Sequence, residues 1–115
     1  MDKGTIVQRA QMQAEFDSQV WQIMSRIKRG HTVPNRKQYK RVMAMLEARA
    51  KVLYHNPSVA INTESDWLAL ALFAEDSLWF ADMCVAANDA RDVTFSKACQ
   101  WLGPLIDERL SEAGI

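Results

Sequence analysis

The sequence predicts an all-α protein, built as a single compact domain of four to five helices in an antiparallel, bundle-like arrangement over residues 1–115. Only four Gly and three Pro occur, too few for the many tight turns of a sandwich or barrel. Hydrophobic residues make up 49% and charged residues 24%, which is typical of a folded chain and unlike a disordered one. Between a few breaker clusters, apolar residues recur at three- and four-residue spacing, which indicates amphipathic helices.

The first helix is predicted over residues 5–29. It opens at Thr5 with Gln8 three residues later, the spacing of a capping box. Gly30 directly after this segment favours a helix end. The apolar stripe that supports the helix consists of Met12, Phe16, Val20, Ile23 and Ile27.

The second helix is predicted from Asn35, again with a glutamine (Gln38) three residues on, to the Asn56-Pro57 pair. A residue that precedes proline disfavours the helical conformation, so this pair marks the end. The stripe of this helix consists of Tyr39, Val42, Met43, Leu46, Ala50 and Leu53.

A third helix is predicted to begin near Thr63 and to run without a break to about Ala87. Residues 67–74 are apolar on all sides, whereas a surface helix has one polar face. We therefore expect this helix to be central.

The fourth helix is predicted from Asp92 or Thr94, with a kink or a split at Gly103-Pro104 because proline lacks the backbone N–H donor. If the third and fourth helices form a hairpin, Cys84 and Cys99 face each other across it. We expect two neighbouring thiols that are buried, reduced and without a catalytic role.

Charges are unevenly distributed, although the formal net charge is zero. Residues 1–55 hold eleven Lys/Arg and four Asp/Glu, while residues 56–115 hold three and ten. Basic helices could pair with acidic ones inside the fold, or the basic face could bind an acidic partner or a nucleic acid. The candidate basic cluster consists of Arg36, Lys37, Lys40 and Arg41.

A second apolar stripe in the predicted central helix consists of Leu68, Leu72 and Trp79. One stripe is enough to pack a helix on one side, so the second indicates either a central helix or a contact with another subunit. These three residues are the candidate partner-binding site, and the partner is expected to be a second copy or another protein.

Sequence motifs for most enzyme chemistries are missing. The chain has no Gly-rich phosphate loop, no dinucleotide fingerprint, and no close Cys/His pairs of the kind that bind zinc. We therefore expect no catalytic residues, no metal and no cofactor. No apolar run reaches the roughly 18 residues of a membrane span, and the first residues do not form a signal-peptide pattern. These two features predict a cytoplasmic protein with no membrane partner.

Two short segments place an arginine a few residues before a histidine: Arg26 with His31, and Arg49 with His55. This spacing resembles that of the all-α HEPN ribonucleases. The resemblance covers two residues at each place, and an apolar Ile27 or Ala50 follows the arginine where the family usually has a polar residue. It implies ribonuclease chemistry, in which arginine holds a phosphate and histidine assists attack by the ribose hydroxyl.

The function that these observations favour is a small non-enzymatic helical protein that acts through protein–protein contact, as a homo-oligomer or an accessory subunit. The alternative is a nucleic-acid-associated regulator that uses the basic cluster. A HEPN-like ribonuclease is the minor alternative.

Overall fold

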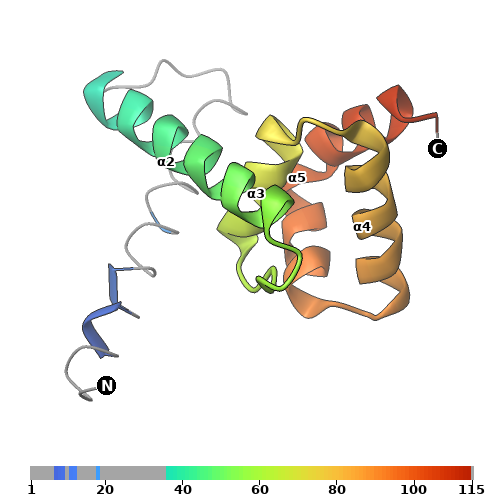
Figure 1. The fold of residues 1–115 in the computed structure, drawn as a ribbon, viewed down its shortest axis with the longest axis horizontal. Coiled ribbons are helices and arrows are strands. Elements are labelled where there is room, and N and C mark those ends of the chain that lie inside the picture. Colours follow the sequence, from blue (N-terminus) through green and yellow to red (C-terminus); the bar gives the residue numbers. More distant parts are fainter. Residues whose placement is uncertain (1–6, 10, 13–17, 19–35, 115) are drawn as a thin grey trace. The chain divides into compact units, whose positions relative to one another are not determined.

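The computed structural model describes residues 7–9, 11–12, 18 and 36–114, with the backbone alone for Gln38 and Trp101 (Figure 1). The described residues form helices and their connections, with no strand among them, so the predicted all-α class is confirmed. The predicted first helix lies mostly outside the described residues. The chain divides into two compact units, residues 1–44 and 45–115, and the boundary falls within one helix. One domain over residues 1–115 stays a prediction.

Helix α2 spans Arg36–His55, which confirms both predicted ends. It ends where Asn56 donates from its backbone N–H and from Nδ2 to the carbonyl of Val52, at 3.1 and 2.8 Å. Pro57 follows and prevents another turn. The buried face of α2 is the predicted stripe in part, with Val42, Leu46, Ala50 and Leu53 in the core.

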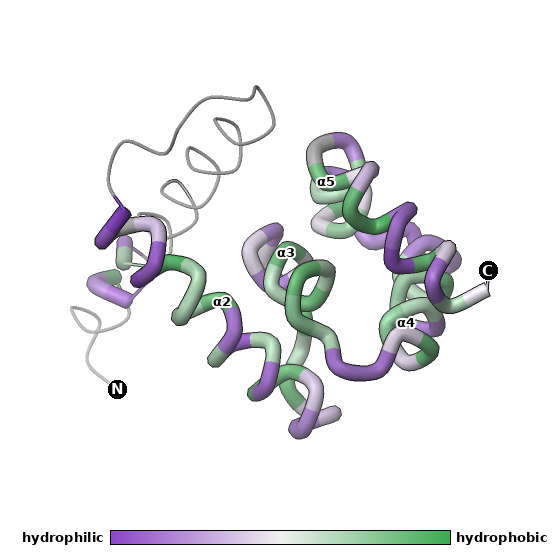
Figure 2. Tube along the Cα trace, turned by 90° about the horizontal axis from the view of Figure 1, so that it is seen from above, coloured by the Kyte–Doolittle hydropathy of each residue, from purple (hydrophilic) through white to green (hydrophobic). Residues whose placement is uncertain are grey.

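Helix α3 spans Glu64–Phe73 and is central, as its composition predicts. Every residue from Ser65 to Ala71 is buried, and the C-terminal part of the helix is hydrophobic in Figure 2. The hydroxyl of Thr63 caps its first turn by accepting the N–H of Asp66 at 3.1 Å. Trp67 packs against Phe95, with 4.7 Å between ring centroids.

The predicted third helix is wrong in length, because α3 ends at Phe73 and a separate helix α4 spans Ser77–Asp89. Ala74 adopts an extended conformation, with φ −61° and ψ 126°. The carboxylate of Asp76 then accepts the N–H groups of Leu78 and Trp79 at 3.0 and 3.1 Å. An aspartate in this position satisfies the first donors of a new helix and so favours a restart.

Helix α5 spans Val93–Glu112 and forms a hairpin with α4. The turn between them holds Arg91 at a positive φ of 56°, and the N–H of Asp92 reaches the carbonyl of Ala87 at 2.9 Å. This bond from beyond the helix end is typical of a Schellman motif. Asp92 then caps α5, where its side chain accepts the N–H of Phe95 at 2.9 Å.

Of the two alternatives predicted at Gly103-Pro104, the split is wrong, because α5 continues through Pro104, and the kink stays a prediction. Proline removes one backbone hydrogen bond of the helix, and the resulting loss of stability is confined to the turn that contains it. The neighbouring side chains of Leu102 and Ile106 are buried, so packing holds the helix on both sides of the proline. Both α3 and α4 pack against α5. None of the helices in the described part of the chain is long and apolar enough to cross a membrane.

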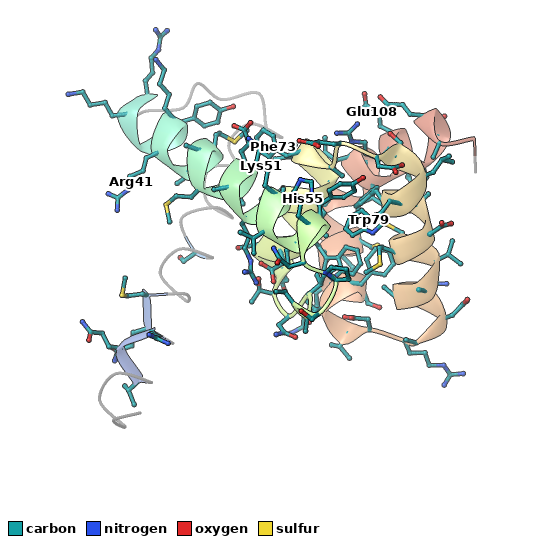
Figure 3. The ribbon with its side chains drawn as sticks, viewed as in Figure 1. Arg41, Lys51, His55, Phe73, Trp79 and Glu108 are labelled. Carbon is teal, nitrogen blue, oxygen red and sulfur yellow. The ribbon has the colours of Figure 1, made fainter. Side chains whose placement is uncertain are left out.

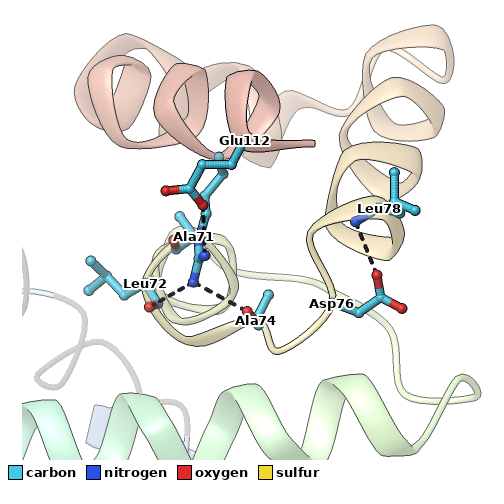
Figure 4. A network of polar contacts seen from close by, with 7 residues as sticks. Ala71, Leu72, Ala74, Asp76, Leu78 and Glu112 are labelled. Carbon is cyan, nitrogen blue, oxygen red and sulfur yellow. Dashed lines mark hydrogen bonds and ion pairs between the residues drawn. The ribbon is translucent and has the colours of Figure 1, made fainter. Parts of the chain in front are cut away.

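One side chain of α5 holds the C-terminal end of α3 (Figure 4). Arg109 donates from Nε to the carbonyl of Ala71 at 3.0 Å, and from Nη2 to those of Leu72 and Ala74 at 3.2 Å each. Its Nη1 pairs with Glu112 at 3.2 Å. The last carbonyls of a helix have no partner within the helix and carry partial negative charge, so a guanidinium stabilises them.

We expect Arg109→Ala to lower the free energy of unfolding by about 2 kcal/mol, because hydrogen bonds from a charged donor each contribute in the range of about 1.5–3 kcal/mol and water replaces part of the loss. Urea unfolding followed by circular dichroism measures the change. The matched control is Lys97→Ala, which removes an exposed cation from the same helix. Equal stability of the two variants would show that Arg109 does not hold α3.

Candidate interaction surfaces

The basic cluster, defined as Arg36, Lys37, Lys40 and Arg41, occupies the first turns of α2 with all four residues exposed. Arg41 extends away from the helix in Figure 3. Among the described residues, none of the four makes an ion pair. The first turn of α2 also has no acidic residue, so the helix dipole adds to the positive potential.

A contact that does join the basic half to the acidic half is the ion pair of Arg49 with Asp66. Nε and Nη2 of Arg49 donate to the two carboxylate oxygens at 2.8 and 3.2 Å, in bidentate geometry. The Asp66 side chain is only 4% exposed, and it also accepts the N–H of Asn62 at 3.2 Å. The hydrogen bond to Asp66 raises the pKa of Arg49. Arg49 thus anchors the start of α3.

The two arginine–histidine pairs that resemble HEPN ribonucleases have different outcomes. Arg26 and His31 lie outside the described residues. Arg49 already donates two N–H groups to Asp66, so holding a phosphate would require it to leave this ion pair. His55 is exposed and stacks edge-on against Tyr54, with 4.9 Å between ring centroids.

The predicted stripe of Leu68, Leu72 and Trp79 does not form one surface. Leu68 is 0% exposed and belongs to the core, which corrects its expected place in a partner contact. The reason is the break at residues 74–76, which places Trp79 on a different helix from the two leucines. Leu72 and Trp79 are half-buried, and Trp79 packs edge-on against Tyr54 of α2 at 5.0 Å. Figure 3 shows Trp79 and His55 with the side chains around them.

Other large apolar side chains are exposed that the sequence analysis did not select. On α2, Met45 is 43% and Val52 42% exposed; on α4, Leu78 is 63% and Val85 47% exposed. In each helix the two residues are seven positions apart, which places them on one face. The sequence does contain a sign of this exposure, because these four apolar residues lie outside the main apolar stripe of their helices.

Cys84 and Cys99 lie on the two helices of the α4–α5 hairpin, where Cys99 acts electrostatically on Cys84, and the two do not form a disulfide. Their reduced state stays a prediction. Burial raises the pKa of the Cys84 thiol to about 12, and the neighbouring Cys99 adds to the effect. Burial also raises the pKa of Cys99, with a smaller contribution from the charge of Asp107. Cys99 is half-buried, so the expected burial is confirmed for Cys84 alone.

No group of three or more His, Cys, Asp or Glu that could hold a metal ion occurs in the described segments. No protein-family model, no curated protein and no solved structure matches this chain. The surfaces described above are therefore the basis for any functional proposal.

We expect Cys84 in a Cys99→Ser variant to react with a thiol reagent at pH 8 more than about a hundredfold more slowly than an unperturbed thiol. The reactive species is the thiolate, and the burial that chiefly raises the pKa of Cys84 from 9.0 to about 12 remains in this variant, while the smaller effect of Cys99 is removed. The rate should rise as the pH approaches 12 and should reach the ordinary value after denaturation. Fast reaction in the folded state would contradict the burial of Cys84.

Proposed function

We propose that this protein acts through protein–protein contact, as a homo-oligomer or as an accessory subunit. The observation that carries the proposal is the pair of exposed apolar ridges on α2 and α4. The α2 ridge is defined by Met45 and Val52, and the α4 ridge by Leu78 and Val85.

Single exposed apolar residues are ordinary on protein surfaces, and by themselves they indicate nothing. Here each helix repeats the exposure after seven residues, which is two turns. Two such side chains on one face form a ridge that another helix can cover, as in helix–helix packing at interfaces. The repetition on two separate helices supports a binding role for these faces.

We expect sedimentation over about 1–100 μM, the range of dissociation constants that a small interface supports, to give a mass that rises above the 13.1 kDa of one chain. Leu78→Asp should reduce this association while circular dichroism remains unchanged, because Leu78 is not in the core. Val93→Asp, which likewise replaces an exposed apolar residue by aspartate on α5, is the control.

The accessory-subunit form of the proposal needs a test in cells. A photo-crosslinking amino acid in place of Leu78 should form an adduct with a protein partner or with a second copy. A chain that stays monomeric over the whole range, and that gives no protein adduct in its native cells, would contradict the proposal.

A second candidate function is association with nucleic acid through the basic cluster. It is favoured by one observation: the four cations are exposed and, within the described part of the chain, have no anionic partner. Clustered cations at a helix N-terminus attract phosphate groups, and this attraction is independent of base sequence.

For this candidate we expect fluorescence anisotropy to show binding of a single-stranded RNA oligonucleotide that weakens steeply with salt. Replacing all four cluster residues with Gln should reduce the slope of log affinity against log salt by about 3, at roughly 0.7 per lost phosphate contact. Lys97→Gln, which removes a cation outside the cluster, should leave the slope unchanged. Absence of binding at low salt would remove this candidate.

A further inference from the structure

We propose that the two ridges cover each other between molecules, so that α2 of one copy packs antiparallel against α4 of a second copy. The inference rests on the proposed function and names the partner as a second copy of this chain. It follows from the spacing, exposure and charge of the residues along the two ridges.

The α2 ridge continues in both directions along one helix face. From one turn before Met45 to the end of the helix, the residues on this face follow at intervals of four, three, four and three. All of them are exposed: Arg41, Met45, Ala48, Val52 and His55.

The α4 ridge has the first three of these intervals in the reverse direction. Read from the end of α4 back toward its start, the exposed residues on this face are four, three and four positions apart. They are Asp89, Val85, Asp82 and Leu78. Identical intervals in opposite chain directions are the requirement for two antiparallel helices to pair residue by residue.

In this register the two apolar pairs meet in the centre, with Met45 opposite Val85 and Val52 opposite Leu78. One end of the register carries opposite charges, since Arg41 lies opposite Asp89. Between these two pairs, the small side chain of Ala48 lies opposite Asp82, whose carboxylate must stay hydrated at the edge of the contact because an unpaired buried charge is costly. The contact thus combines two apolar pairs with a charge pair at one end.

Charge also decides which helices pair. Helix α2 holds six Lys/Arg and one Glu, whereas residues 75–89 hold four Asp/Glu and no Lys/Arg. Two copies of α2, or two copies of α4, would place like charges together, which disfavours those pairings. Pairing of α2 with α4 joins opposite charges, and each copy of the chain supplies both helices. In a two-fold dimer the contact occurs twice.

The same pairing is not made within one chain. Tyr54 and Trp79 bring α2 and α4 of one molecule together at 5.0 Å between ring centroids. The ridge residues nevertheless stay open to solvent, including Leu78, which immediately precedes Trp79. Within the described part of the chain, both ridges are therefore open for a contact with a second molecule.

The test exchanges the charges at one end of the register and measures association by sedimentation. Arg41→Glu and Asp89→Arg should each weaken self-association by about tenfold or more, because each places like charges opposite each other in both contacts of a dimer. An equimolar mixture of the two variants should associate within about threefold of the original chain. In the mixed dimer one contact retains the original Arg41–Asp89 pair, and the other contains the same pair with its two charges exchanged.

The matched control is Lys40→Glu, which makes the same charge change on an exposed residue of α2 that lies off the ridge. It should weaken association by less than about threefold, because an exposed charge outside the contact is screened by solvent. Self-association that does not respond to either ridge variant, or that mixing does not restore, would overturn the register while leaving the proposed function intact. A monomer at every concentration would overturn it as well. A protein adduct at position 78 in cells would then still support an accessory subunit.

Discussion

Helix α3 is buried along most of its length, so the polar groups at both of its ends must find partners within the protein. At the start, Thr63 caps the first turn and Arg49 of α2 pairs with the buried carboxylate of Asp66. At the end, Arg109 of α5 donates to the carbonyls of the last turn and of Ala74. Two arginines from opposite sides in sequence therefore hold one apolar helix, and the packing of the helices around it depends on them.

This arrangement distinguishes the arginines that hold the fold together from the exposed cations that can bind a partner. Arg49 and Arg109 are engaged with Asp66 and with the end of α3, and their charges are compensated inside the fold. The basic cluster at the start of α2 has no such role in the described part of the chain. The same burial explains why Leu68 is a core residue: a helix covered on all sides has no apolar stripe left for a partner.

A contact between copies of the chain through α2 and α4 would explain why basic residues are concentrated in one half of the sequence and acidic residues in the other. Opposite charges on the two helices would select the mixed pairing and disfavour the two symmetrical ones. The apolar side chains would supply affinity through burial, while the charge pair at one end would set direction and register. An interface of one helix pair is small, so such association would be reversible and sensitive to salt.

The sequence by itself determined the all-α class, both ends of α2, the cap at Thr63 and the central place of α3, and it limited the start of α5 to Asp92 or Thr94, because spacing and capping are local properties. It also located the basic cluster, whose exposure follows from its place opposite the apolar stripe. The break at residues 74–76 combines a local cap at Asp76 with hydrogen bonds from Arg109, which lies more than thirty residues away. The continuous helix through Pro104 depends on buried neighbours. Likewise, whether Leu68, Leu78 or Val85 faces the core or the solvent is decided by which helices pack together, and only the tertiary structure contains that information.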